Sequence, residues 1–175
     1  MSERVFLATT AIEDFWNKNK NILFLGEWCK LYNRKNEWSR LKHNTLKFIW
    51  DKKKMEEACL YCDSVYERVL DELTGILNNI HNIHKGKQYY RIILGNWLIH
   101  FIQQLYDKFL TLKAAFREHS DLETFILDES QYYIPFENND FIAKVVDDRF
   151  ALQMYSCLLY TSDAADELDG VDLGG

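Results

Sequence analysis

The feature that most constrains the fold is a long segment in which apolar residues recur every three or four positions. Between positions 52 and 80 these residues are Met55, Ala58, Cys59, Cys62, Val65, Tyr66, Val69, Leu70, Leu73, Ile76, Leu77 and Ile80. This spacing places them along one stripe of an α-helix. We therefore predict a helix over residues 52–80, and Asp51 is placed to cap its first turn.

A second long helix is predicted over residues 88–117, after a polar loop that contains His81 and His84. This segment is apolar around most of its circumference, which predicts burial on several sides. The short loop favours an antiparallel helix pair. A transmembrane helix needs roughly 20 mostly apolar residues. Polar and charged residues interrupt this segment at Asn96, His100, Gln103, Gln104 and Asp107, so no transmembrane segment is predicted.

Short apolar runs rich in β-formers predict strands at residues 4–9, 22–25, 45–50 and 123–127. The spacing of Thr10 and Glu13 is that of a capping box, which predicts a short helix to about Trp16. A further helix is predicted over residues 141–155. The expected fold class is α/β, helix-rich, with a small and mostly parallel sheet of short strands and two long helices.

The candidate site is the stretch Asn21–Tyr32, four apolar residues that run into Gly26, Glu27 and Trp28. A buried strand that ends here would deliver these residues to its carboxyl end, where open α/β sheets bind ligands. Glu27 is a candidate base or hydroxyl acceptor, and Trp28 is a candidate stacking face for a sugar. Glycine lets the backbone approach a ligand, and Arg34 would supply an anion contact.

A purely structural role for these residues stays open, with Trp28 packed and Glu27 paired with Arg34, Lys30 or Arg91. The stretch lacks the three spaced glycines of a dinucleotide loop and the Gly-Lys-Ser/Thr sequence of a P-loop. A nucleotide-phosphate site is therefore not predicted in this chain.

Two pairs of potential zinc ligands, Cys59-x-x-Cys62 and His81-x-x-His84, imitate a two-plus-two zinc pattern. About twenty helical residues would hold the pairs roughly 30 Å apart. Both cysteines also fall on the apolar stripe of the first long helix, where small apolar residues belong. We predict that the cysteines pack in the core and that no metal is bound.

Residues 157–175 resemble the translation of a transposon-end sequencing adapter, and they contain five acids and no base. We expect a truncated N-terminal domain over residues 1–156 and an artefactual tail, of which little beyond Leu158–Tyr160 could pack. Without the tail, 22 acidic residues face 21 basic ones, and this balance gives no support for a nucleic-acid partner. The sparse cysteines and the lack of a signal peptide predict a cytoplasmic protein.

Two motifs, Phe6-Leu-Ala-Thr-Thr-x-x-Glu13-x-Phe-Trp16 and the Leu-Gly-Glu-Trp-Cys run after Ile22, carry a family resemblance. With Trp50-Asp51 and the segment from Tyr90 to Leu98, they resemble the N-terminal part of a family of bacterial transferases of O-antigen and other surface-carbohydrate biosynthesis. The resemblance covers residues 4–156. The family pattern has His where this chain has Ile49, so the Trp50-Asp51 junction receives no catalytic role.

The resemblance implies one half of a two-domain glycosyltransferase-like fold. The missing C-terminal domain would bind a sugar-nucleotide donor, and the fragment alone would be inactive. Its partners would be that domain and a carbohydrate or lipid-linked acceptor. Glu27 would be catalytic by orienting an acceptor hydroxyl, and Gly26, Trp28 and Arg34 would bind substrate. The alternative function is a non-catalytic helical protein-interaction module whose two long helices form the binding face.

Overall fold

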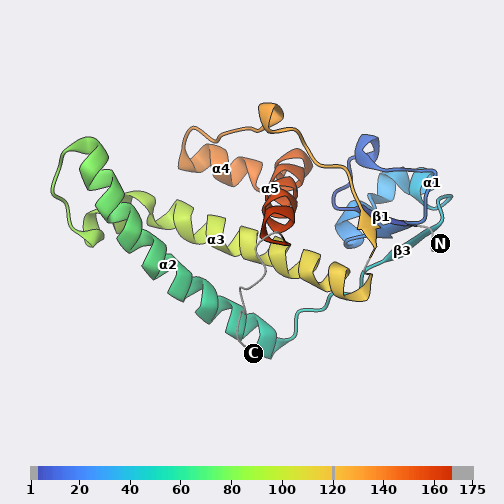
Figure 1. Ribbon diagram of the computed structural model, residues 1–175, viewed down its shortest axis with the longest axis horizontal. Helices are drawn as coiled ribbons and strands as arrows, with labels where there is room; N and C mark the ends of the chain where they lie inside the picture. Colours follow the sequence, from blue (N-terminus) through green and yellow to red (C-terminus); the bar gives the residue numbers. More distant parts are fainter. Residues whose placement is uncertain (1–3, 120, 167–175) are drawn as a thin grey trace. The chain divides into compact units, whose positions relative to one another are not determined.

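The computed structural model describes residues 4–119 and 121–166 (Figure 1). Two compact units make up the chain. Unit 1 is drawn from residues 1–48, 109–134 and 146–175, and unit 2 consists of residues 49–108 and 135–145. The prediction of one domain over residues 1–156 followed by a separate tail stays a prediction.

Unit 1 contains a four-stranded sheet in which every neighbouring pair is parallel. The strands are β1 (Val5–Ala8), β2 (Ile22–Phe24), β3 (His43–Thr45) and β4 (Leu122–Glu123), in the order β3-β2-β1-β4. Phe6 is paired with Ile22, and Ile22 with His43. The small parallel sheet of short strands was predicted and is confirmed.

The central strands are apolar on both faces because both faces are covered, as is usual for parallel sheets. All three residues of β2 are buried, as are Phe6, Leu7 and Ala8 of β1. The residues that cover them come from the C-terminal turns of α3 (Lys87–Glu118), from α5 (Asp148–Asp166) and from the segments between strands: Trp16, Cys29, Leu46, Leu112, Ala115, Tyr155 and Leu159. This cluster is the core of unit 1.

Short helical turns connect the strands of unit 1. They are the 3₁₀ turns η1 (Glu13–Phe15), η2 (Glu27–Cys29) and η3 (Tyr32–Arg34), followed by α1 (Lys35–Trp38). The helix predicted from Thr10 to Trp16 is therefore reduced to a single turn. The carbonyl oxygen of Thr10 accepts a hydrogen bond from the indole Nε1 of Trp16 at 2.9 Å, and the segment loops around that contact.

Two predicted strands are misplaced or shortened. The strand predicted at 45–50 lies instead at His43–Thr45. Leu46 N donates the final hydrogen bond of this strand pair to Phe24 O, because β2 ends at Phe24. The strand predicted at 123–127 is only Leu122–Glu123. Beyond it, Leu127 N bonds the Ser156 hydroxyl at 2.8 Å, which draws the chain away from the sheet. The turn η4 (Glu129–Gln131) follows.

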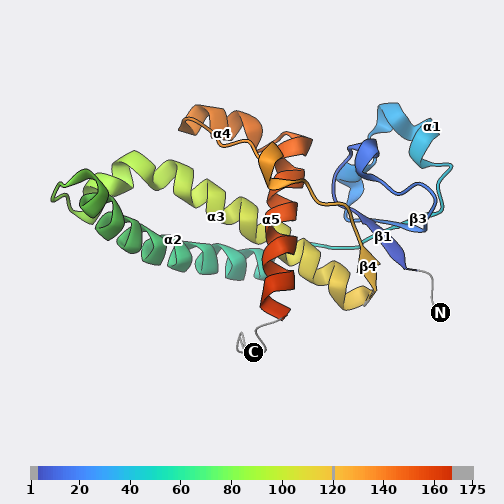
Figure 2. The same ribbon diagram turned by 45° about the horizontal axis from the view of Figure 1, so that its top comes forward.

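Unit 2 is built on two long antiparallel helices, α2 (Lys52–His81) and α3 (Lys87–Glu118), which run side by side in both views (Figures 1 and 2). Residues 87–108 of α3 belong to this unit. Both helices were predicted within one residue of their ends. As predicted, Asp51 caps α2 by accepting a bond from Lys54 N at 2.9 Å. The core between the helices contains Cys62, Leu70, Tyr90, Leu98 and Ile102.

The prediction that α3 is buried on several sides is wrong near its N-terminus. The short helix α4 (Asn138–Lys144) packs further along, where Phe141 contacts the rings of Trp97 and Phe101. The first turns of α3 have α2 on one side, and Ile92 and Ile93 remain 76% and 55% exposed.

The helix predicted over 141–155 is two helices, α4 and α5 (Asp148–Asp166). The Asp147 carboxylate accepts bonds from Arg149 N and Phe150 N, at 2.8 and 3.2 Å, and so starts α5 afresh. Within the described ranges, no helix combines the length and the apolar character needed to cross a membrane.

Candidate functional site at the carboxyl edge of the sheet

The carboxyl ends of parallel strands meet at one edge of a sheet, where α/β proteins bind ligands. In this chain β1 is followed at that edge by Thr9 and Thr10, which are both buried. The next strand, β2, is followed by Leu25 and then by Gly26 and the turn η2. Both segments belong to unit 1, so their side chains can form one site.

The indole of Trp28 is anchored at this edge but not enclosed. Its Nε1 donates a hydrogen bond to the carbonyl oxygen of Thr9 at 3.1 Å, and 46% of the residue is exposed. A Cβ atom on Gly26 would lie 2.1 Å from Cζ3 of the Trp28 ring. The backbone of Gly26 is extended, so glycine is needed here for space. That space is filled by the Trp28 ring.

Glu27 projects into solvent, with 80% of its side chain exposed, and its Oε1 is 2.9 Å from Lys30 Nζ. Lys30 directly follows η2 and is three positions from Glu27. Of the three partners suggested for Glu27, the structure pairs it with Lys30. The Lys30 ammonium also lies 5.5 Å from the centre of the Trp38 ring. The Lys30 side chain is only 12% exposed, but the Glu27 carboxylate faces solvent and can therefore also accept a ligand hydroxyl.

Arg34 is paired with Glu13, which lies just after β1. Arg34 Nε donates to Glu13 Oε1 at 2.7 Å, and Lys18 Nζ donates to Oε2 at 2.9 Å. The hydrogen bonds from Arg34 and Lys18 lower the pKa of Glu13 from 4.5 to about 2, despite the opposing effect of partial burial. Glu13 is 13% exposed and Arg34 is 53% exposed, so the carboxylate lies inside and the guanidinium faces outward.

The structure therefore brings Gly26 and Trp28 into contact and gives Glu27 and Arg34 separate partners. Sequence reasoning assigned Glu13 to a capping box and did not predict its central position in a charged cluster. No side chain caps the turn η1, whose N-cap residue is the apolar Ile12, and the Glu13 carboxylate is held by Arg34 and Lys18. Glu13 and Arg34 are 21 residues apart in the sequence, so no local sequence pattern predicts their ion pair.

Cys29 supports this edge from inside the core. It is fully buried, and its Sγ donates to the carbonyl oxygen of Ala8 at 3.3 Å. Burial raises the pKa of its thiol to about 12. The thiol therefore stays protonated at neutral pH and packs rather than acting as a nucleophile.

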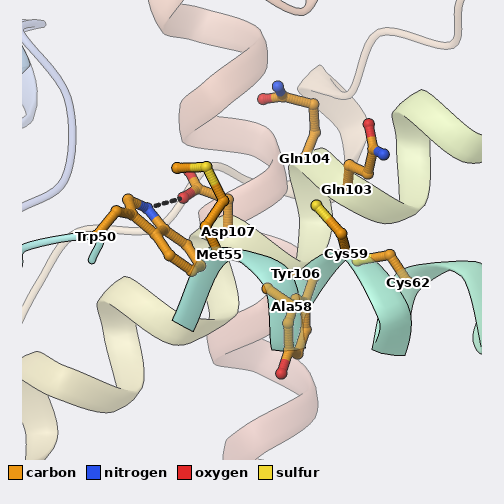
Figure 3. Close-up of a pocket in the computed structure, with 9 residues that line it drawn as sticks. All are labelled: Trp50, Met55, Ala58, Cys59, Cys62, Gln103, Gln104, Tyr106 and Asp107. Atoms are coloured by element: carbon orange, nitrogen blue, oxygen red, sulfur yellow. Dashed lines mark hydrogen bonds between the residues drawn. The ribbon is translucent and has the colours of Figure 1, made fainter. Parts of the chain in front are cut away.

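A hollow of about 310 Å³ lies between α2 and α3 in unit 2 (Figure 3). Trp50 Nε1 donates to Asp107 Oδ1 at 3.1 Å, and the side chain of Met55 lies beside this pair. The remaining lining residues are Ala58, Cys59, Cys62, Gln103, Gln104 and Tyr106. The wall is mainly apolar, and its polar groups include the amides of Gln103 and Gln104 and the carboxylate of Asp107.

The cysteine pair lies in the first half of α2, and the histidine pair lies at the end of this helix and after it. The helix is continuous from Lys52 to His81, so Cys62 and His81 are about 28 Å apart along its axis. Cys62 packs in the core of unit 2, as predicted, whereas Cys59 is exposed and the prediction of burial is wrong for it.

A parallel sheet covered by helices, with an anchored aromatic ring and ionic side chains at its carboxyl edge, defines an α/β protein, a class that usually binds ligands at this edge. The chain belongs to the LIC12162 family of transferases, whose family model matches residues 5–169. The match extends past Ser156. No curated protein and no solved structure matches the chain.

Proposed function

We propose that the chain is the N-terminal, acceptor-binding part of a glycosyltransferase-like enzyme of surface polysaccharide or O-antigen biosynthesis. Membership of a transferase family supports the reaction class. The observation that carries the acceptor role is Trp28, whose indole is fixed to Thr9 yet remains 46% exposed at the carboxyl edge of the sheet. A flat, immobilised aromatic face with a polar edge suits a sugar ring.

Each proposed site residue has a separate role. The Trp28 ring stacks on the apolar face of the acceptor sugar, and Gly26 leaves the space that sets the ring's position. The exposed Glu27 carboxylate orients an acceptor hydroxyl and takes its proton. Arg34 uses one of its five N–H donors on Glu13, and the others bind the phosphate of a phosphorylated or lipid-linked acceptor.

The sugar-nucleotide donor is proposed to bind to a C-terminal half of the full-length transferase, so this chain alone transfers no sugar. The uninterrupted gene is then expected to encode a second α/β half with a nucleotide-binding loop. A stop codon soon after Ser156 in that gene would contradict the transferase proposal and favour the alternative, a non-catalytic helical interaction module.

Acceptor binding can be tested on this chain by NMR of its five tryptophan indole N–H groups. Titration with a hexose phosphate should shift the Trp28 signal, assigned by its loss in Trp28→Phe, and should leave the buried Trp16 signal in place. Gly26→Ala should weaken binding because the new methyl group displaces the ring. Binding that survives Trp28→Phe unchanged, or no binding at all, would contradict the acceptor role.

The role of Glu27 requires the full-length enzyme. Glu27→Gln keeps the shape of the side chain and removes its charge, so turnover should fall by about 10²-fold or more with the melting temperature unchanged. Lys30→Gln is the matched control, because it breaks the same ion pair and keeps the carboxylate. Equal loss in both variants, or unchanged turnover with a lower melting temperature in Glu27→Gln, would make Glu27 a structural partner of Lys30.

A further inference from the structure

Large apolar side chains are exposed at the turn end of the α2–α3 hairpin. We call residues 76–93 the hairpin tip. Its exposed apolar side chains are Ile76 at 51%, Ile80 at 67%, Tyr89 at 41%, Ile92 at 76% and Ile93 at 55%. Such a concentration is unusual for a surface in contact only with water, and it marks an interaction site.

All five positions lie within about two helical turns of the loop, in a layer that is measured along each helix from its own end. An α-helix rises 1.5 Å per residue, so Ile76 is about 8 Å from the end of α2 at His81. Ile93 is about 9 Å from the start of α3 at Lys87. The layer is thus about 10 Å deep and includes positions on both helices.

The hairpin tip contains no acidic residue. None occurs anywhere from Leu73 to Tyr106. The nearest acids are Glu72, about 14 Å along α2 from His81, and Asp107, about 30 Å along α3 from Lys87. The formal charges inside the layer are those of three bases, Lys85, Lys87 and Arg91.

Two of these bases also hold the hairpin together. Lys87 Nζ is 2.9 Å from carboxylate oxygens of both Glu67 and Asp71, and Arg91 bonds both oxygens of Glu67. The third, Lys85, places its ammonium 5.4 Å from the centre of the Tyr89 ring. Tyr89 and Lys85 thus form an aromatic and basic pair beside the exposed isoleucines.

The loop of the hairpin tip is held in place by Asn78. Its side chain accepts from Lys85 N and from the Tyr90 hydroxyl, and donates to Lys85 O, each at 2.9 Å. Asn82, in the left-handed conformation with φ of 50°, ends α2. The exposed side chains are therefore presented on a preformed turn, which lowers the ordering cost of binding.

We propose that the hairpin tip inserts into the headgroup layer of an anionic lipid surface. Proteins at such interfaces bury apolar side chains about 5–10 Å deep, and basic residues beside them attract the lipid phosphates. Tyrosine is favoured at the same level. The exposed apolar side chains on two helices, the Lys85–Tyr89 pair and the lack of acidic residues between Leu73 and Tyr106 match this occupant.

Charge complementarity favours a lipid surface over a protein partner, because the neighbouring carboxylates of Glu67 and Asp71 are already paired with Lys87 and Arg91 and the Lys85 ammonium lies beside the exposed Tyr89. A second copy of this chain would bring the same bases face to face. The inference goes beyond the acceptor-binding proposal and does not depend on it. Saccharide binding at Trp28 and lipid binding at the hairpin tip can fail separately.

The test is co-sedimentation of the chain with vesicles. Vesicles of phosphatidylcholine with phosphatidylglycerol should bind it, binding should fall as salt rises, and pure phosphatidylcholine should bind it weakly. Ile92→Glu should reduce partitioning by about tenfold or more. Leu60→Glu is the matched control, because Leu60 is 71% exposed on α2 and about 30 Å from the end of that helix. It should leave partitioning unchanged.

Circular dichroism and the melting temperature show whether each variant is folded, and Lys85→Glu gives a second test that keeps every apolar side chain. Equal losses in Ile92→Glu and Leu60→Glu, or no binding of the original chain to anionic vesicles, would overturn the proposal. A dimer in sedimentation that Ile92→Glu dissociates, without vesicle binding, would overturn it in favour of a second copy.

Discussion

The hydroxyl oxygen of Tyr66 on α2 lies 2.6 Å from the position that a Cβ atom would occupy on Gly95 of α3. The next nearest atoms are Cγ of Arg91 at 3.6 Å and Cζ of Tyr66 at 3.7 Å, which are ordinary contacts. Gly95 is therefore needed because of a single oxygen atom. The Tyr66 ring is also held by the Arg91 guanidinium, 5.4 Å from its centre.

A double-mutant cycle should separate this contact from helix propensity. In a Tyr66→Phe background, Gly95→Ala should stabilise the chain by up to about 1 kcal/mol, the usual gain of Ala over Gly in a helix. In the original background the new methyl group meets the hydroxyl, so most of this gain should be lost or reversed. Urea unfolding measures both effects, and equal effects in the two backgrounds would contradict the contact.

The Glu13 cluster predicts a loss of stability in acid. The pKa of Glu13 is lowered in the folded chain, so its contribution is complete above about pH 4.5 and is lost as the pH falls towards 2. Glu13→Gln should remove about 1 kcal/mol at pH 7, after allowance for solvent screening of Arg34, and should flatten this part of the pH profile. Arg34→Gln should add little to Glu13→Gln, and additive losses would contradict the pairing.

Leu98 tests the core of unit 2. It is 2% exposed between α2 and α3, and Leu98→Ala should cost about 2–5 kcal/mol by removing apolar contacts and leaving a cavity. Ile92→Ala on the same helix, at an exposed position, should cost less than about 0.5 kcal/mol. Chemical denaturation compares the two, and a loss at Leu98 below about 0.5 kcal/mol would show that α3 is misplaced.

The C-terminal segment can be tested by truncation. Deletion of residues 161–175 should leave the melting temperature unchanged, because the segment resembles translated adapter sequence and was predicted not to pack. Leu159→Ala should lower the melting temperature by roughly 4 °C or more, because Leu159 is 9% exposed in the core of unit 1. A fall of several degrees on deletion would contradict the artefactual origin of the tail.

The two long helices were predictable because an apolar repeat of three and four residues that lasts for many turns fits an α-helix and does not fit a strand. The first two strands were predicted within one residue of their ends, but the ends of β3 and β4 were not predictable, because a strand ends where its neighbour ends. Residues 45–50 have the composition of a strand. However, Phe24 O is the last β2 carbonyl that accepts a hydrogen bond from this segment, so β3 ends at Thr45. The break between α4 and α5 depends on one side chain, Asp147, inside an otherwise helical pattern.

The candidate site was predictable only where it is local. Gly26 and Trp28 are neighbours in the sequence, and their contact follows from the turn η2. The pairing of Glu27 with Lys30 was one of three alternatives, and the same turn decides it. The bond between Glu13 and Arg34 joins the segments after β1 and β2, so it exists only once the strands are aligned.

The pairing of Val5 with Leu122 has a consequence for how the polypeptide is made. The partners at this edge are about 117 residues apart, so the ribosome has synthesised all of α2 and α3 before β4 exists. The α2–α3 hairpin, whose contacts are local, can fold before β4 is made, at a stage when the apolar side chains of β1 and β2 are still uncovered. Newly made chains should therefore need protection by chaperones at the N-terminal strands rather than at the hairpin.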